Sequence, residues 1–147
     1  NDAPSTITRL QNMGTPDYLI SAACQLVLAQ RLARRTCKDC RVPDEDVTPK
    51  VLQDLGFTAE QASRAKAFKG KGCPKCKDTG YKGRQGIYEI LVVSKPLKEA
   101  ILRQATTPEL REIAVKEGFQ TMQDMGRRLI SAGDLNFREY ERVLSNE

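Results

Sequence analysis

The sequence of 147 residues has no histidine and no tryptophan, and it contains only four Phe and four Tyr. We therefore expect an aliphatic core. No apolar run approaches the roughly 20 residues that a membrane-spanning helix needs, and neither an initiator Met nor a basic-then-apolar leader is present. Hydrophobic residues make up 39% and charged residues 29%, which is typical of globular proteins and not of disordered chains. These features predict a soluble protein, or an excised piece of one.

The cysteine pattern predicts that the chain has no disulfide bonds. The five cysteines are an odd number, and four of them form two Cys-x-x-Cys pairs with no signal segment before them. This pattern is typical of reduced thiols and not of a secreted disulfide scaffold, so we expect a cytoplasmic location. At this length the chain can bury the core of one domain, or of one and a half, without disulfides.

The sequence also lacks the parts that hold ATP. No Gly-rich loop ends in Gly-Lys-Ser/Thr, and no strand ends in an acidic residue placed to bind Mg²⁺. We therefore expect no ATP hydrolysis by this chain alone. A haem attachment site is excluded as well, because neither Cys pair is followed by His.

Helix signals recur along the chain, mostly as a Ser, Thr or Asn cap with Pro just inside the first turn. They predict a first helix over residues 4–13 that stops at Gly14. From Pro16 to Arg35, apolar residues recur at spacings of three and four, which predicts one long amphipathic helix. Its last turn would hold Arg34 and Arg35, where cations complement the helix dipole.

Two short helices are predicted between the cysteine pairs, and a strand after them. Thr48-Pro49 opens the first helix, and Thr58 with Gln61 forms a capping box for the second. The run from Gly86 to Val93 is the best candidate for a strand, so the predicted β content is small.

The C-terminal third is predicted to be a bundle of helices. Helix starts fall at Ser94, Thr107-Pro108, Thr121 and Asn136, with Gly118 and Gly133 as stops. Apolar residues at helical spacing are interpreted as its packing residues. They are Leu97, Ile101, Leu102, Leu110, Ile113, Ala114, Met122, Met125, Leu129, Ile130, Phe137 and Leu144.

The two Cys-x-x-Cys pairs are spaced as knuckles, each able to present both sulfurs from one tight turn. Zn²⁺ favours four such ligands in a tetrahedron at about 2.3 Å, which leaves no open position for a substrate. We therefore predict one structural zinc ion held by Cys37, Cys40, Cys73 and Cys76. The glycines and backbone amides around Cys73 favour turns in which N–H groups point at sulfur.

Two other interpretations of the pairs remain, a redox dithiol and an iron cluster. Two matched pairs favour zinc over both. Cys24 is excluded from the site, because a free Cys among the Leu and Ala residues of a predicted helix behaves as a small buried hydrophobe.

Basic residues lie densely around the pairs, which allows two explanations. Such clusters bind nucleic acid, but a tetrathiolate zinc centre is a local dianion that nearby cations stabilise. The formal charge of +5 falls to about +3 once four thiolates and one Zn²⁺ are counted. Only Tyr81 and Phe68 offer stacking surfaces, which disfavours nucleic acid. The basic residues are Arg34, Arg35, Lys38, Arg41, Lys69, Lys71, Lys75, Lys77, Lys82 and Arg84.

Together these motifs resemble the C-terminal end of the secretion and pilus-assembly ATPases, the PilB/GspE-type hexameric motors. The resemblance is carried by Asn1-Asp2-Ala3-Pro4 with Thr8-Arg9-Leu10, by Leu28-Ala29-Gln30-Arg31-Leu32, and by the block from Cys73 to Gly80-Tyr81-x-Gly83-Arg84-x-Gly86-Ile87-Tyr88-Glu89. The last block is the most specific. After about Leu91 the resemblance is only that of a general helical pattern.

The resemblance implies an α+β, mainly helical fold in three parts. Residues 1–36 would be the tail end of a RecA-like ATPase domain. Residues 37–93 would be a tetracysteine zinc-binding subdomain with a helical insertion and a small β ribbon, and residues 94–147 a C-terminal helical subdomain.

The resemblance also implies a function. The full-length protein would be an ATP-hydrolysing homo-hexamer that binds ATP and Mg²⁺ outside this chain and acts at the cytoplasmic membrane through platform proteins. Retraction motors generally lack the tetracysteine element, so assembly or secretion is favoured. This chain would contact the catalytic core of the same polypeptide, with a structural and docking role, no catalytic residues and no nucleic-acid partner. The alternative is a free-standing zinc module that binds nucleic acid or protein.

Overall fold

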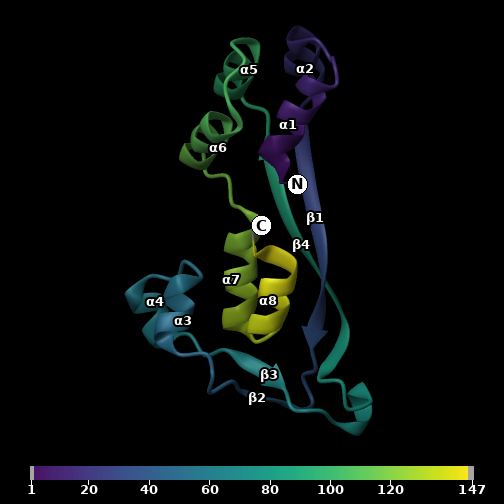
Figure 1. Ribbon diagram of the computed structural model, residues 1–147, viewed down its shortest axis with the longest axis vertical. Coiled ribbons are helices and arrows are strands. Elements are labelled where there is room, and N and C mark those ends of the chain that lie inside the picture. The colour runs from purple at the N-terminus through teal and green to yellow at the C-terminus, as the bar shows by residue number, and fades with distance from the viewer. Residues whose placement is uncertain (1, 146–147) are drawn as a thin grey trace. The chain divides into compact units, whose positions relative to one another are not determined.

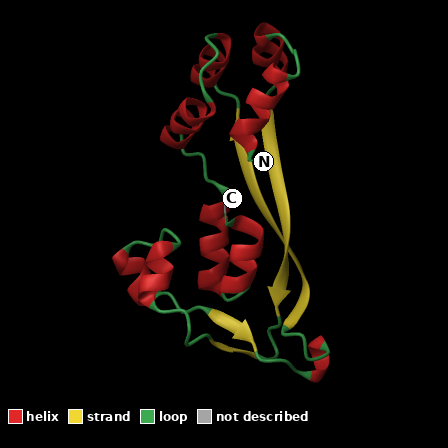
Figure 2. Ribbon diagram, in the orientation of Figure 1, coloured by secondary structure: helices red, strands yellow, loops and turns green. Residues whose placement is uncertain are grey.

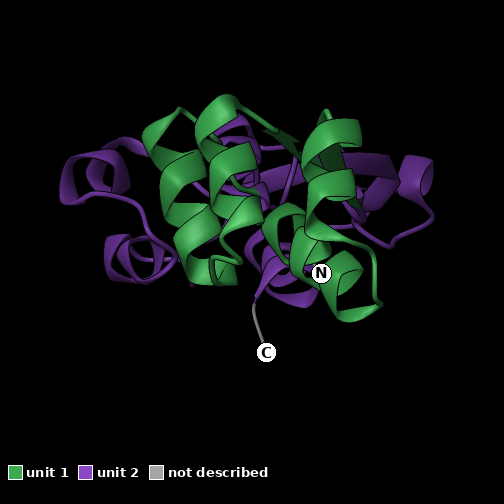
Figure 3. Ribbon diagram, turned by 90° about the horizontal axis from the view of Figure 1, so that it is seen from above, with its two compact units in different colours: residues 1–30, 88–121 green, residues 31–87, 122–147 purple. Residues whose placement is uncertain are grey.

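The computed structural model describes residues 2–145, which form helices and two pairs of strands (Figures 1 and 2). The prediction of an α+β protein is confirmed. The chain forms two compact units (Figure 3): unit 1 comprises residues 1–30 and 88–121, and unit 2 comprises residues 31–87 and 122–147. Within residues 2–145, every helix is too short or too polar to cross a lipid bilayer.

Unit 1 is helical around an apolar core. Its helices are α1 (Ala3–Asn12), α2 (Asp17–Ala23), α5 (Lys95–Leu102) and α6 (Thr107–Lys116), and it also holds the start of β1 (Leu26–Thr36) and the end of β4 (Tyr81–Val92). The core is aliphatic, as predicted, because its buried members are Ala3, Ile7, Ile20, Leu91, Val93, Leu97, Ala100, Ile101, Ala105, Leu110 and Ala114.

The helix boundaries of unit 1 follow the predicted caps closely. Gly14 follows α1 with a φ of +93°, a left-handed conformation that favours glycine. Ser94 caps α5, where its Oγ accepts a hydrogen bond from the Leu97 N–H at 3.4 Å. α6 is capped by Thr106, one residue earlier than predicted, since the Thr106 hydroxyl accepts from the Glu109 N–H at 3.3 Å. The Thr107 hydroxyl is instead hydrogen-bonded to that of Thr8 at 2.6 Å.

Unit 2 combines short helices with small strands. It holds the end of β1 and the start of β4. Its other elements are β2 (Arg41–Pro43), α3 (Pro49–Asp54), α4 (Ala59–Arg64), β3 (Phe68–Gly70), the 3₁₀ turn η1 (Pro74–Cys76), α7 (Met122–Ala132) and α8 (Phe137–Leu144). β2 and β3 pair antiparallel, with Arg41 opposite Gly70. The predicted capping box is present, since Thr58 caps the Gln61 N–H and the Gln61 side chain accepts from the Thr58 N–H.

The predicted helix from Pro16 to Arg35 is wrong. α2 ends at Ala23, and β1 occupies Leu26–Thr36. Side chains of β1 alternate between two faces, so that Val27 and Ala29 pack on the core of unit 1 while Leu26 and Leu28 are exposed. When almost every second residue is apolar, apolar residues also recur at a spacing of four, so the pattern fits a helix as well as a strand. Pairing with β4 selects the strand.

This correction also changes the secondary structure assigned to three residues. Arg34 and Arg35 lie in a strand, so the explanation through a helix dipole does not apply to them. Cys24 is the residue that follows α2, half-buried at the edge of the unit 1 core, and it does not lie within a helix.

The strand predicted at Gly86–Val93 is confirmed, but β4 begins earlier, at Tyr81, and ends one residue earlier, at Val92. Figure 1 shows β1 and β4 side by side and running in opposite directions. Of the predicted tail helices, α5 and α6 belong to unit 1 and α7 and α8 to unit 2. Most predicted packing residues are buried, but Leu102 is 53% exposed. The division of the chain into residues 1–36, 37–93 and 94–147 remains a prediction.

Within unit 1, the outer face of the two strands is apolar. Val27, Ala29, Leu91 and Val93 face the helical core. The alternate positions carry large hydrophobic side chains that are 41% to 64% exposed, namely Leu26, Leu28, Tyr88, Ile90 and Val92. Strands with apolar side chains on both faces are typical of sheets that are covered on both faces.

Candidate metal centre

The first cysteine pair lies in the turn between β1 and β2. Cys37 follows the end of β1, and Cys40 directly precedes β2 at Arg41. The Cys37 N–H donates to the Gly80 carbonyl at 3.0 Å, and the Cys40 carbonyl accepts from the Lys71 N–H at 3.1 Å. The backbone of the first knuckle is therefore tied on both sides to the chain around the second.

The second pair is formed by a tight turn. Cys73 is extended and caps the 3₁₀ turn η1, which ends at Cys76. Lys77 and Asp78 then adopt left-handed conformations with φ of 56° and 61°, which reverse the chain toward β4. Gly70 and Gly80 are both required at their close approach, because a Cβ on Gly70 would lie 2.0 Å from the Gly80 carbonyl oxygen and a Cβ on Gly80 would lie 2.7 Å from the Gly70 carbonyl oxygen.

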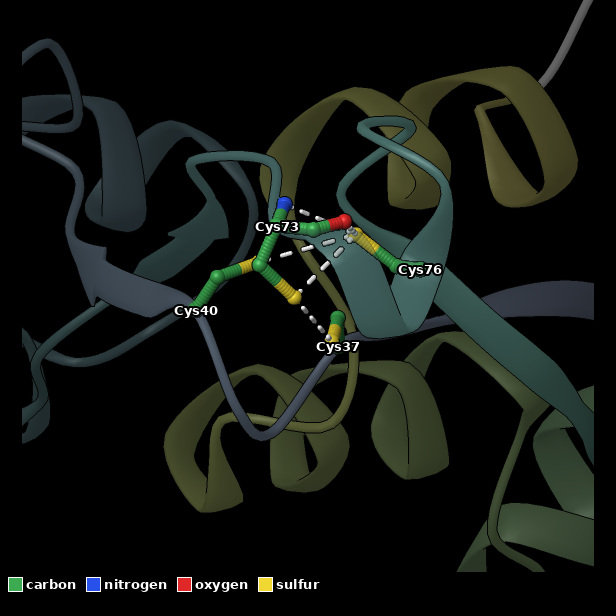
Figure 4. A group of neighbouring side chains, drawn as sticks. All are labelled: Cys37, Cys40, Cys73 and Cys76. Atoms are coloured by element: carbon green, nitrogen blue, oxygen red, sulfur yellow. Dashed lines mark hydrogen bonds between the residues drawn. The ribbon is translucent and has the colours of Figure 1, made fainter.

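The four cysteines that sequence reasoning selected meet at one point in unit 2 (Figure 4). Their Sγ atoms all lie within 4.8 Å of one another. The Sγ–Sγ distance is 3.8 Å from Cys37 to Cys73, 3.8 Å from Cys40 to Cys76 and 3.7 Å from Cys73 to Cys76. These separations are too long for disulfide bonds, and all four cysteines are free thiols.

Backbone N–H groups point at two of the sulfurs, as the glycine-rich sequence predicted. The Gly72 N–H donates to Cys40 Sγ at 3.2 Å. The Cys73 and Gly80 N–H groups donate to Cys76 Sγ at 3.3 and 3.2 Å. Such N–H···S bonds stabilise negative charge on sulfur, which is the form that binds a metal ion.

The electrostatics differ between the two sulfurs. Burial raises the pKa of the Cys76 thiol, but the hydrogen bonds from the Cys73 and Gly80 N–H groups outweigh it and lower this pKa to about 6. At Cys40, burial and the neighbouring thiols raise the pKa to about 12, against a smaller lowering by the Gly72 N–H. Four thiolates at this spacing need a cation to balance their charge.

The donor set and its spacing fit a tetrahedral metal ion. Sulfurs at about 2.3 Å from a common centre in a tetrahedron lie about 3.8 Å apart. The observed separations of 3.7 and 3.8 Å agree with this value. Cys37 and Cys76 are buried and Cys40 and Cys73 half-buried, so the cluster is largely shielded from water. Cys24 belongs to unit 1 and is not part of the cluster.

Several of the basic residues near the cluster have acidic partners. Lys75 lies 3.6 Å from Asp39, and Lys69 lies 3.9 Å from Asp44. Arg34 forms an ion pair with Glu139 at 2.9 Å. The guanidinium of Arg41 lies over the Phe68 ring at 5.2 Å. Part of the positive charge that favoured nucleic acid in the sequence is therefore neutralised within the fold.

Sequence reasoning missed a buried carboxylate of unit 2 that contacts β1. The Glu139 side chain is fully buried, and it accepts from the Arg34 N–H at 2.6 Å and from the Arg142 guanidinium at 2.7 Å. Hydrogen bonds from Arg142, which outweigh the opposing effect of burial, and from Arg34 lower the pKa of Glu139 to about 2. The i,i+3 spacing of Glu139 and Arg142 was the only local signal, and surface pairs share it.

Fold and site define a small α+β protein with a tetracysteine cluster able to hold one metal ion. The chain belongs to the family of type II/IV secretion system proteins, whose model matches residues 1–142. This result confirms the family resemblance that the sequence motifs indicated.

Three relatives illustrate the similarity. The chain is 37% identical over 139 residues to the type IV pilus assembly ATPase PilB of Myxococcus xanthus, covering 95% of this chain and 25% of that protein. It is 43% identical over 129 residues to PilB of Thermus thermophilus, covering 86% and 14%. It is 36% identical over 141 residues to the type II secretion system ATPase E of Vibrio cholerae, covering 86% and 27%. The chain thus spans about a quarter or less of these relatives.

Proposed function

We propose that this chain is the zinc-binding C-terminal part of a traffic ATPase that powers type IV pilus assembly or type II secretion. In this role it is structural and docks other parts of the motor, and it is not catalytic by itself. The observation that carries the proposal is the gathering of four cysteine sulfurs within 4.8 Å of one another in a member of this family. The printed names of the relatives support the two transport systems.

The metal ion would be held by Cys37, Cys40, Cys73 and Cys76 and would be zinc. Four protein ligands fill the coordination sphere of zinc, so the ion supplies positive charge and cross-linking and offers no open position for a substrate. It would join the end of β1 to the start of β4 through two turns that residues 41–72 separate in the sequence. Metal ligation of this kind contributes directly to folding.

ATP and Mg²⁺ would be bound by the parent protein outside this chain, which has no phosphate-binding loop of its own. In the proposal, residues 1–36 end a RecA-like domain, residues 37–93 form the zinc-binding subdomain and residues 94–147 the helical subdomain. The whole protein would assemble as a homo-hexamer and act in the cytoplasm, at the inner face of the membrane, through platform proteins.

The apolar outer face of unit 1 supports a contact with the catalytic core of the same polypeptide. Leu26 and Leu28 from β1 and Ile90 and Val92 from β4 are at least half exposed. A two-stranded sheet is marginally stable alone and gains stability from a further strand or layer. The relatives are about four times longer than this chain or more, so a parent protein of that length has residues to cover this face.

The experiment that tests the proposal is metal analysis of the purified chain under reducing conditions. We expect about one zinc per chain, retained by Cys24→Ser and lost from Cys73→Ser. Calorimetry with ATP and Mg²⁺ should give no saturable heat. If Cys24→Ser empties the site while Cys73→Ser leaves it filled, the ligand assignment is wrong, and micromolar ATP binding would contradict the non-catalytic role.

A matched test addresses the alternative of a nucleic-acid module. Charge reversal at Lys69, Lys71 and Lys77 should change the weak binding of DNA at about 50 mM salt very little, because a phosphate track needs several unpaired cations. Sub-micromolar binding of an oligonucleotide near physiological salt, lost on these reversals, would favour the alternative.

A further inference from the structure

The corner between α7 and α8 lies against the residues that flank the first cysteine knuckle. We define the α7–α8 corner as residues 132–136. The N–H of Thr36, which precedes Cys37, donates to the Asp134 carbonyl at 3.0 Å. The guanidinium of Arg41, which follows Cys40, donates to the Ala132 carbonyl at 3.3 Å. Both ends of this knuckle therefore hold the backbone of the corner.

The second knuckle reaches the same corner through Tyr81. Its neighbour Gly80 donates to Cys76 Sγ and accepts from the Cys37 N–H, so the start of β4 is fixed to both knuckles. The Tyr81 hydroxyl accepts a hydrogen bond from Asn136 Nδ2 at 2.9 Å. Asn136 also caps α8, since its Oδ1 accepts from the Glu139 N–H at 2.7 Å.

The buried carboxylate extends these contacts along α8. Glu139 accepts from the backbone N–H of Arg34 in β1 at 2.6 Å and from its guanidinium at 2.9 Å. The same guanidinium lies over the Tyr81 ring at 4.0 Å from its centroid. Tyr81 thus contacts both groups that position α8, namely Asn136 at its cap and Arg34 at its carboxylate.

The corner also has little room to shift. Gly133 has a φ of +82°, and a Cβ at this position would lie 2.4 Å from Arg41 Nη1 and 3.2 Å from the Phe68 ring. The close packing makes the position of the corner depend on that of Arg41, the residue after Cys40.

From these contacts we propose that the metal state of the cysteine cluster controls the docking of the α7–α8 hairpin, residues 122–144. When an ion gathers the two knuckles, Thr36, Arg41 and Tyr81 are in place to hold the corner. When the ion is removed, no metal bonds link the two turns and their like-charged thiolates repel one another. The positions of Thr36, Arg41 and Tyr81 are then no longer fixed, and the hairpin is released. The inference rests on the proposed metal site, and it assigns that site a regulatory output.

Linkage makes the inference quantitative. If metal binding stabilises the docked hairpin by some factor, docking must increase metal affinity by the same factor. A change that weakens the contacts of the corner without touching a cysteine should therefore also weaken metal binding. Tyr81→Leu is such a change, because it removes the hydroxyl and the ring and leaves all four thiols. Tyr18→Leu, at an exposed tyrosine of α2 in unit 1, is the matched control.

The test is hydrogen exchange of the whole chain, loaded with Zn²⁺ or stripped by a chelator under reducing conditions. In the stripped wild type, amides of α7 and α8 should exchange at least about tenfold faster, while those of α5 and α6 change by less than about twofold. Tyr81→Leu should bind one zinc, exchange faster in α8 even when loaded, and hold zinc less tightly. Tyr18→Leu should match the wild type in all three measurements.

The outcomes separate this inference from the proposed function. A chain that binds no zinc overturns both. A chain that binds zinc but shows equal α8 exchange with and without it overturns the inference and leaves the metal site intact. Equal acceleration in α8 and in α5–α6 also overturns it, since the effect is then a loss of the whole fold. So does a Tyr81→Leu chain with wild-type exchange and zinc affinity.

Discussion

Both units pack on buried apolar side chains, and each buries a carboxylate, Glu89 in unit 1 and Glu139 in unit 2. Within residues 2–145, only unit 2 gathers four cysteines, and its Glu139 forms ion pairs with Arg34 and Arg142. Burial of apolar surface is non-directional and survives changes of pH, metal and redox conditions. Thiolate–metal bonds and a buried ion pair do not, because each depends on a protonation state or on an ion. The two units should therefore respond differently to the same treatment.

The largest expected difference follows removal of the metal. A Cys37→Ser chain, or wild type with a strong chelator, should lose several kcal/mol of stability in unit 2, toward the value of about 10 kcal/mol found for small zinc peptides. Unit 1 should keep its helices. Urea unfolding followed by circular dichroism should change from one transition to two, with Cys24→Ser as the control. A single unshifted transition would show that the cluster contributes nothing to folding.

The opposite change deletes part of the core of unit 1. Leu97 is fully buried in α5, so Leu97→Ala should destabilise unit 1 by about 3 kcal/mol through lost burial and the cavity that remains. Zinc content and hydrogen exchange in α8 should stay at the wild-type level. Leu102→Ala, at an exposed position of the same helix, should cost less than about 1 kcal/mol. Zinc loss from Leu97→Ala would mean that the units are not independent.

The next effect tests the buried carboxylate of unit 2. Glu139→Gln keeps the size of the side chain but removes the charge that accepts from Arg34 and Arg142, and it should cost about 2–3 kcal/mol. Glu60→Gln removes an exposed ion pair with Arg64 in the same unit and should cost less than about 0.5 kcal/mol. Thermal unfolding of the two variants compares them directly. Equal small losses would show that Glu139 is not a packing determinant.

The smallest effect is a pH dependence of the same group. The pKa of Glu139 is about 2 in the folded chain against 4.5 for a free glutamate, so the unfolded chain binds the proton first as pH falls. The stability from this carboxylate is complete above about pH 4.5 and declines toward pH 2, with about 2 kcal/mol lost by pH 3. Glu139→Gln should lack this component. Because zinc also leaves in acid, the quantity to measure is the difference between the two chains.

Much of the local structure could be predicted because its cause is local. The caps at Ser94, Thr58 and Asn136 act within one helical turn, and the structure places each at the start of its helix. The helix prediction was wrong between residues 24 and 36, and the cause is non-local. The side-chain spacing allowed a helix, and the pairing with β4, some fifty residues later, selected a strand.

The candidate site shows the same division. The spacing of Cys37 with Cys40 and of Cys73 with Cys76 was sufficient to select the four side chains that the fold gathers, because each pair is formed by one short turn. Nothing near Glu139 or Tyr81 in the sequence indicates that one would be fully buried and the other would contact the cap of α8. Those roles depend on which distant segments become neighbours.

The sequence by itself therefore determined the cysteine cluster, the caps and the family, since each rests on residues a few positions apart or on a contiguous pattern. Only the tertiary structure decided that residues 26–36 form a strand, that the tail helices belong to different units, and that the α7–α8 corner lies against the knuckles. The physical reason is that burial and hydrogen bonding between distant segments are set by the fold as a whole and can override a local preference.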